Sequence, residues 1–263
     1  MEDYGRAVRL DAGSAEAHYR RGLVYARQGD LTKALQDQYR ALELDPDHVG
    51  ALTARGAAYA TLGDFQGALS DLDRACIIAP KFFEAFYQRG LVRHQLEMTG
   101  EALQDLTRVI ELAPDFAPAF AARADAYLVM NEPAQAMADY DRAIELEPKS
   151  AATYNSRGMA RAAGSDYRGA ITDFDQALEL DPAMALALAN RGAAYEKLGD
   201  YEQAIRDLNR ALVLSPDLAV AYYIRGMAYG SKGEYDRASR DLNKAVELDP
   251  SLGKKQKAGA GAG

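Results

Sequence analysis

The sequence predicts an all-α protein built from seven tandem copies of a 34-residue, two-helix unit, because three rows of residues recur with this single period. The first row is an Arg-Gly pair at Arg21-Gly22, Arg55-Gly56, Arg89-Gly90, Arg157-Gly158, Arg191-Gly192 and Arg225-Gly226, with Arg123-Ala124 filling the gap. The second row is proline, at Pro46, Pro80, Pro114, Pro148, Pro182, Pro216 and Pro250. The third row is alanine, at Ala34, Ala68, Ala102, Ala136, Ala170, Ala204 and Ala238. The rows place the repeats at 15–48, 49–82, 83–116, 117–150, 151–184, 185–218 and 219–252.

The first helix of each unit is predicted from helical spacing. In the first unit Ala17, Arg21, Gly22 and Tyr25 fall at i, i+4, i+5 and i+8, which is one face of a helix. Gly29 then interrupts the pattern, since glycine readily takes the left-handed conformation that ends helices. We expect the equivalent turns near Gly29, Gly63, Glu97, Asn131, Gly164, Gly199 and Gly233.

The second helix carries Ala34, Ala41, Leu42 and Leu44, and Pro46 stops it because proline lacks the amide hydrogen and clashes with the preceding turn. Gly22 and Ala34 lie seven residues before and five after the turn at Gly29, so they meet across the hairpin. With no bulky side chain at these places, the two helices can approach closely.

The unit AHYRRGLVYARQGDLTKALQDQYRALELDP therefore resembles the tetratricopeptide repeat family, whose signature it carries as Gly22, Tyr25, Ala34, Ala41 and Pro46. The resemblance covers residues 15–252 in seven copies. It implies a right-handed α-solenoid, or superhelix, in which first helices line a concave groove and second helices form the convex back. It also implies protein or peptide ligands.

The two ends depart from this pattern. Tyr4, Ala7, Val8 and Leu10 lie 34 residues before positions of the first unit's second helix, so residues 1–14 are expected to be the second helix of a truncated preceding repeat. This favours a piece of a longer array, with a natural half-repeat acting as a cap as the alternative. Residues 253–263 are expected to form a flexible Lys/Gly/Ala tail.

Each unit also contains an arginine and an aspartate at equal distances from the turn, so the two should face each other in an antiparallel hairpin. We interpret them as structural ion pairs that fix the register of the helices. The alternative is a ladder of ligand-binding arginines. The pairs are Arg21 and Asp37, Arg55 and Asp71, Arg89 and Asp105, Arg123 and Asp139, Arg157 and Asp173, Arg191 and Asp207, and Arg225 and Asp241.

Composition narrows the class of partner and the compartment. The net charge is −8 and the pI is near 5.0, which disfavours nucleic acid and anionic membranes because both need a cationic footprint. A single cysteine, Cys76, fits a reducing compartment. The first residues, MEDYGRAVRL, lack the basic stretch and apolar run typical of a signal peptide, and no run approaches the roughly 18 apolar residues of a membrane span. A cytoplasmic location is expected, with the nucleus possible.

The sequence predicts no enzyme, no cofactor and no metal site. His18, His48 and His94 occupy three different places in the unit, so they do not converge. Cys76 falls beside the alanine row and is expected to be a small buried residue. No glycine-rich phosphate loop, CxxC or HExxH motif occurs.

The remaining candidate site is the groove, where the resemblance places the first-helix side chains that the hairpin does not use: Tyr19, Leu23, Tyr87, Leu91, His94, Asp125, Leu128, Asn155, Met159, Asn190, Tyr223 and Met227. Units three to five are the least regular, so we expect the partner there. The predicted function is a scaffold or adaptor that binds a protein or peptide. Two alternatives stay open: a regulatory or targeting arm of a larger, possibly enzymatic protein, and a helical-repeat RNA binder, which the acidic charge disfavours.

Overall fold

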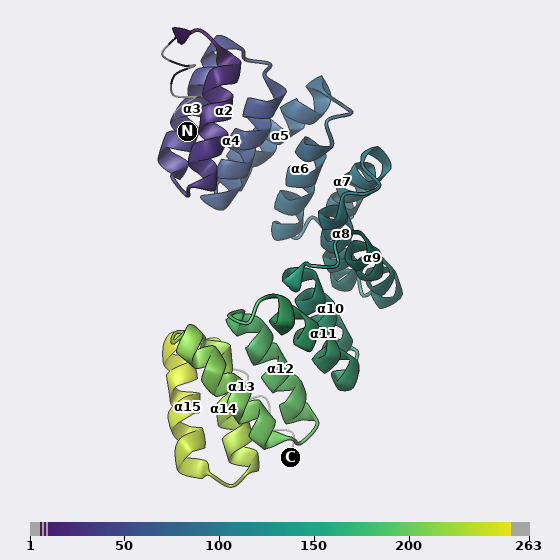
Figure 1. The fold of residues 1–263 in the computed structure, drawn as a ribbon, viewed down its shortest axis with the longest axis vertical. Coiled ribbons are helices and arrows are strands. Elements are labelled where there is room, and N and C mark those ends of the chain that lie inside the picture. Colours follow the sequence, from purple (N-terminus) through teal and green to yellow (C-terminus); the bar gives the residue numbers. More distant parts are fainter. Residues whose placement is uncertain (1–5, 7, 9, 254–263) are drawn as a thin grey trace. The chain divides into compact units, whose positions relative to one another are not determined.

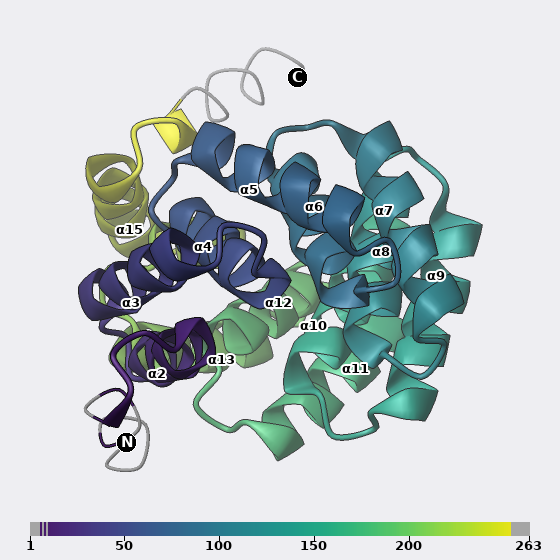
Figure 2. The ribbon, with the colours of Figure 1, turned by 90° about the horizontal axis from the view of Figure 1, so that it is seen from above.

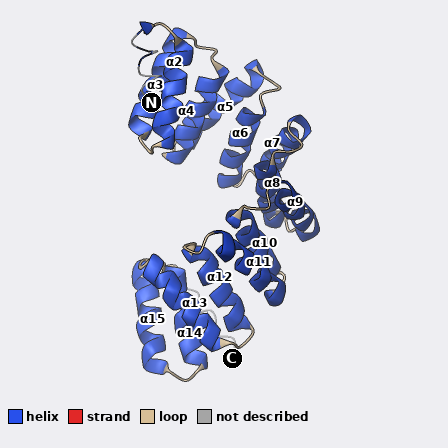
Figure 3. Ribbon diagram, in the orientation of Figure 1, coloured by secondary structure: helices blue, strands red, loops and turns tan. Residues whose placement is uncertain are grey.

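The computed structural model describes residues 6, 8 and 10–253, and over these residues it contains fourteen defined helices, α2 to α15, and no strand (Figure 3). The chain divides into two compact units, Met1–Leu146 and Glu147–Gly263. The predicted fold class, an all-α array of helical hairpins, is confirmed.

The first unit contains four antiparallel hairpins (Figure 1). They are α2 (Ala15–Arg27) with α3 (Leu31–Leu44), α4 (Val49–Thr61) with α5 (Phe65–Ile78), α6 (Phe83–Gln95) with α7 (Thr99–Leu112), and α8 (Ala117–Val129) with α9 (Pro133–Leu146). The first helices also contact one another, α2 with α4, α4 with α6 and α6 with α8. These helices therefore lie next to each other along one side of the unit (Figure 2).

The second unit contains three hairpins built in the same way. They are α10 (Ala151–Ala163) with α11 (Tyr167–Leu180), α12 (Ala185–Lys197) with α13 (Tyr201–Leu214), and α14 (Ala219–Ser231) with α15 (Tyr235–Leu248). Here too the first helices are neighbours, α10 with α12 and α12 with α14.

The turn inside each hairpin uses one residue in the left-handed region, and these residues are spaced by 34: Gly29, Gly63, Glu97, Asn131, Ser165, Gly199 and Gly233, with φ between 59° and 82°. The expected turn near Gly164 is confirmed, and within it Ser165, with φ 66°, takes the left-handed conformation, whereas Gly164 has φ −78°. The period, and not the nearest glycine, decides which residue adopts the left-handed conformation.

Close packing across each hairpin explains the Arg-Gly row. A Cβ atom at Gly56 would lie 2.8 Å from Cγ of Leu72 and 3.2 Å from the carbonyl oxygen of Ala68, and Gly192 and Gly226 are equally crowded. A side chain there would force the helices apart, since interiors are packed without spare volume. In repeat four, Ala124 takes this place and is fully buried.

Aromatic side chains between repeats pack on the next hairpin. The rings of Phe83 and Phe116 are 5.1 Å apart, and Phe82 packs against the core cluster that contains Leu52 and Cys76. The ring of Tyr87 meets Phe116 edge-on at 5.1 Å. Inter-repeat packing therefore accounts for these phenylalanines.

The predictions for the two ends stay predictions. Val8 is buried and Leu10 is 78% exposed, whereas Tyr4, Ala7 and the tail from residue 254 onward lie outside the described residues. Within the described part of the chain, no helix has both the length and the apolar character needed to cross a membrane.

Candidate functional site

In each of the seven repeats, the arginine of the first helix forms two parallel hydrogen bonds with the aspartate of the second. Nε donates to Oδ2 and Nη2 donates to Oδ1, over 2.6 to 3.0 Å. The seven aspartates are buried, and the arginines are partly exposed. Hydrogen bonding to Asp139 raises the pKa of Arg123, and the same cause acts on Arg21, Arg55 and Arg225. This bidentate geometry fixes how the two helices of a hairpin sit against each other.

Several of these arginines also contact the preceding repeat. Arg89 Nη1 donates to Asp73 over 2.7 Å, and Arg191 Nη1 donates to Asp175 over 2.6 Å. In the last repeat, Arg225 Nη1 donates to Asn209 Oδ1 over 2.7 Å. An arginine that bridges two repeats is occupied by the protein itself, which favours the structural interpretation over the ligand-binding one.

Sequence reasoning missed this second set of contacts. The signal is a polar residue two positions after the paired aspartate, at Asp73, Asp175 and Asn209. Carboxylates two apart on a helix point in different directions, and here the two directions serve two different arginines.

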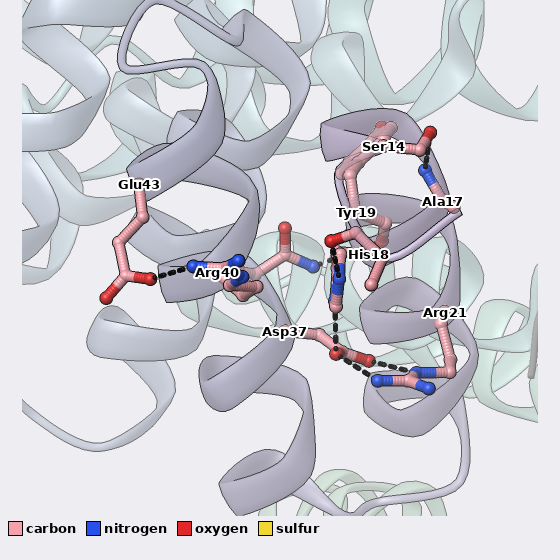
Figure 4. A network of polar contacts seen from close by, with 10 residues as sticks. Ser14, Ala17, His18, Tyr19, Arg21, Asp37, Arg40 and Glu43 are labelled. Atoms are coloured by element: carbon pink, nitrogen blue, oxygen red, sulfur yellow. Dashed lines mark hydrogen bonds and ion pairs between the residues drawn. The ribbon is translucent and has the colours of Figure 1, made fainter. Parts of the chain in front are cut away.

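Two repeats have an arginine, Arg93 or Arg161, at the position that Tyr25 holds in the first repeat, and this second arginine also reaches the aspartate of the interface ion pair. Arg93 donates to Asp105 over 2.7 Å, and Arg161 lies 2.9 Å from Asp173. In the first repeat a histidine takes a similar part, since His18 Nδ1 lies 3.2 Å from Asp37 Oδ1 (Figure 4). Figure 4 shows His18 and Arg21 both pointing from α2 toward Asp37 on α3.

His48 has surroundings separate from those of His18. It caps α4, because its Nδ1 accepts a hydrogen bond from the amide of Ala51, and its Nε2 lies 3.0 Å from Glu16.

The single cysteine, Cys76, is buried, and burial raises the pKa of its thiol to about 11. A thiol with this pKa is a poor nucleophile at neutral pH.

The second unit has an open pocket of about 290 Å³ between α10, α11 and α12. Phe174 is buried at the pocket, whereas Met159 is 50% exposed. The lining consists of Met159, Ala162, Tyr167, Phe174, Asn190, Ala193, Ala194 and Lys197. Small alanines beside large aromatic rings leave a mostly apolar hollow with a polar rim, which is the general character of ligand pockets.

Two of the predicted groove residues meet at this pocket through a hydrogen bond. Asn190 Nδ2 donates to Asn155 Oδ1 over 2.9 Å, which ties α12 to α10. Asn155 is buried and its amide also lies 3.6 Å from the sulfur of Met159. Asn155 therefore positions Asn190 and Met159, and these two side chains line the pocket.

The first unit has a second apolar pocket, of about 400 Å³, between α2, α3 and α4. The predicted groove residue Leu23 lines it, together with Ala26, Gly29, Leu31, Ala34, Gln38, Ala54, Ala57, Ala58 and Thr61. Nearby, the ring of Tyr19 packs over Gly50, whose Cβ would lie 2.7 Å from the ring. Tyr19 also stacks at 4.9 Å on His48, so part of this side chain serves packing.

Five predicted residues of the first unit lie on the neighbouring helices α6 and α8. Tyr87, Leu91 and His94 come from α6, and Asp125 and Leu128 come from α8. All five are partly buried. The hydroxyl of Tyr140, on α9, donates to Asp125.

The last two predicted residues, Tyr223 and Met227, lie on α14 in the second unit, where Met227 is 41% exposed. The predicted set is thus distributed over both units: the α6–α8 group belongs to the first unit, and Asn155, Met159 and Asn190 belong to the second.

Sequence models described as "Tetratricopeptide repeat" or "TPR repeat" match residues 23–81, 83–116, 117–150, 158–199, 185–218 and 219–252. The chain belongs to the tetratricopeptide repeat family. The Arg–Asp pairs, the glycine row and the turn row described above thus belong to consecutive tetratricopeptide repeats.

Solved structures of other tetratricopeptide repeat proteins share this fold. The APC/C hetero-tetramer Cut9–Hcn1 is 19% identical with a TM-score of 0.81; the match covers 94% of this chain and 49% of that one, so this chain spans about half the length of its relative. A tetratricopeptide repeat protein from Parabacteroides merdae is 21% identical with a TM-score of 0.71, covering 91% and 96%. YrrB, described as "a TPR protein with an unusual peptide-binding site", is 22% identical with a TM-score of 0.53, covering 70% and 95%. No curated protein matches the sequence.

Tetratricopeptide repeats generally act as protein-interaction scaffolds that bind proteins or peptides, and they are typically non-catalytic. The surface to consider is therefore the side formed by the first helices, where both apolar pockets involve residues of neighbouring first helices.

Proposed function

We propose that this protein is a non-catalytic scaffold or adaptor that binds a peptide or protein segment in the groove lined by its first helices. The observation that carries this proposal is the pocket between α10 and α12, where Met159 and Asn190 border a hollow above Phe174. An exposed methionine adapts its shape to an apolar side chain, and an amide at the rim can bond a peptide backbone.

Further support comes from the arginines and aspartates that recur every 34 residues. The paired arginines and aspartates bond each other, so they present few unused hydrogen-bonding groups to a substrate. The described residues contain no cluster of histidine, cysteine or acidic side chains able to hold a metal ion. The peptide-binding site named for YrrB is a property of that protein, and a ligand of the same kind is proposed for this chain.

The test begins with a random phage-displayed peptide library selected against the full chain. An enriched peptide is then synthesised with a fluorophore, and its Kd is measured by anisotropy. Ala193→Phe places a bulky side chain in the pocket between α10 and α12, so it should weaken binding by about tenfold or more, a loss of roughly 1.4 kcal/mol. The matched control is Ala138→Phe, at an exposed position of the second helix α9.

Both variants should keep the helical content and Tm of the parent. If enriched peptides bind Ala193→Phe as tightly as the parent, or if no peptide is enriched, the proposed groove function is wrong.

A further inference from the structure

Asp125 is partly buried and differs from the seven buried aspartates of the hairpin interface in its partners. The seven aspartates of the hairpin interface each accept two hydrogen bonds from an arginine. Asp125 accepts a hydrogen bond from the Tyr140 hydroxyl, and none of the ion pairs among the described residues includes it. A carboxylate removed from water without a cation is unfavourable, and burial accordingly raises the pKa of Asp125.

His94 lies close enough to interact electrostatically with Asp125, but none of the ion pairs among the described residues joins the two. Nδ1 of His94 is buried and has no hydrogen-bond partner.

The helices α6 and α8 carry aromatic and apolar side chains near Asp125. Tyr87 lies close enough that the charge of Asp125 contributes to raising its pKa, after the larger effect of burial. Tyr87 offers an aromatic ring, and Leu91 and Leu128 are the other partly buried groove residues on the same two helices. Apolar and aromatic walls accept the methylene stem of lysine or arginine, while a carboxylate holds the charged end.

We propose that the groove face of α6 and α8 binds a lysine or arginine side chain of the partner, with Asp125 as its counter-ion. The partner is thus a peptide or protein segment with a basic residue at this place. This inference rests on the proposed function, because it assigns the chemistry of the ligand to one stretch of the same groove.

Charge complementarity supports a basic partner. The chain carries a formal net charge of −8, so its field attracts cationic segments and repels acidic ones. Asp125 then provides a local contact that fixes the position of one basic residue, because a pair in a partly buried site is screened less than one at the surface.

The experiment uses the full chain, with its histidine rings labelled with ¹³C, at 150 mM NaCl. The probes are Nα-acetyl-arginine methylamide, the lysine equivalent, and the neutral isostere Nα-acetyl-citrulline methylamide. The chain has three histidines, so His94→Gln assigns the reporter signal, and His18 and His48 act as internal controls. The arginine or the lysine probe should shift the His94 signals in a saturable manner, and the citrulline probe should bind at least tenfold more weakly.

Two variants separate a binding role from a structural one. Asp125→Asn removes the charge but keeps an oxygen that can accept from Tyr140, and it should weaken binding of the basic probe at least tenfold. Tyr140→Phe removes that hydrogen bond but keeps the charge, and it should bind the basic probe within about threefold of the parent.

Three results would overturn the inference: no saturable shift of His94 with either basic probe, citrulline binding within twofold of arginine, or an unchanged Kd in Asp125→Asn. If one of these results is obtained while Ala193→Phe still abolishes peptide binding, the proposed groove function is kept. Only the inference that Asp125 binds a basic side chain is then rejected. Failure of both experiments would instead remove the groove function itself.

Discussion

At the hairpin interface, every repeat places an arginine against an aspartate at equivalent positions, whereas on the groove face the side chains vary along the array, and Asp125 stands where the first and third repeats have Leu23 and Leu91. The contrast is clearest between two aspartates. Asp173, at the interface, is 1% exposed and is held by Arg157 and Arg161. Asp125, on the groove face, has a phenol hydroxyl as its partner.

The difference teaches that repetition at the interface serves folding, and that the variable groove face is where the proposed partner would be recognised. A paired charge at the interface stabilises one arrangement of two helices, and repeating it stabilises the array. An unpaired charge at the groove contributes little to folding, so its presence there needs another explanation. Removing an interface ion pair should therefore lower the free energy of unfolding, whereas removing the charge of Asp125 should raise it.

The largest expected effect comes from the interface. Asp173→Ala leaves two arginines without their acceptor in a buried place and should lower the free energy of unfolding by about 3–5 kcal/mol. Urea denaturation followed by circular dichroism measures this change. Asp115→Ala, at an exposed loop position, is the control and should change stability by less than about 0.5 kcal/mol. Equal effects of the two substitutions would remove the structural role of the ion pairs.

A smaller effect, of opposite sign, is expected at the turns. Glu97 holds φ 60° where four other repeats use glycine. A residue with a Cβ atom pays about 1–2 kcal/mol for this conformation, so Glu97→Gly should stabilise the first unit by about 1 kcal/mol. The reciprocal change, Gly63→Glu, should destabilise it by a similar amount. A loss of stability in Glu97→Gly would show that the glutamate side chain is needed at the turn.

A still smaller gain is expected from Asp125→Asn, and it should depend on pH. Burial raises the folded-state pKa of Asp125 above its ordinary value of 3.8, so the folded state binds a proton more tightly than the unfolded state does. The destabilising contribution of Asp125 is therefore absent below pH 3.8 and grows as the pH rises through the folded pKa. Asp125→Asn should raise Tm at pH 7, and the difference from the parent should vanish toward pH 3.8. A Tm that falls at pH 7 would mean that Asp125 has a stabilising partner.

The last prediction concerns the reactivity of Cys76, which reports whether the first unit stays closed around this side chain. Cys76 is buried and its thiol has a pKa of about 11 instead of 9.0, so the thiolate fraction at pH 8 is lower than in the unfolded chain by about 100-fold. Reaction with DTNB should be slower in the native protein than in guanidinium chloride by at least that factor. Fast labelling of the native protein would show that the first unit opens readily around α5.

The features that recur every 34 residues could be predicted from the sequence. The helices, the facing of Arg21 and Asp37, and the close approach at Gly56 all depend on spacing within one repeat, and spacing is visible in the sequence. The turn near Gly164 was also predicted, and the period identifies Ser165 as its left-handed residue, since Ser165 lies 34 positions from its equivalents.

The groove side chains were harder to assign because their surroundings depend on how one repeat packs on the next. Tyr87 was expected to be left over after packing, yet its ring packs against Phe116. Tyr87 therefore also serves packing between repeats. Asn155 was predicted to line the groove, but it is buried and accepts a hydrogen bond from Asn190. These contacts join different repeats, and the 34-residue spacing does not describe them.

The arginines that reach back to the preceding repeat also determine how cooperatively the array unfolds. A tetratricopeptide array behaves approximately as a chain of units with nearest-neighbour couplings, and a shared side chain adds to one such coupling. Between repeats two and three the shared group is an ion pair, Arg89 with Asp73, whereas between repeats three and four Arg123 meets only the neutral hydroxyl of Thr107, at 3.3 Å. The shared side chain therefore adds a charged contact to the first of these couplings and a neutral one to the second, next to the helix that carries Asp125.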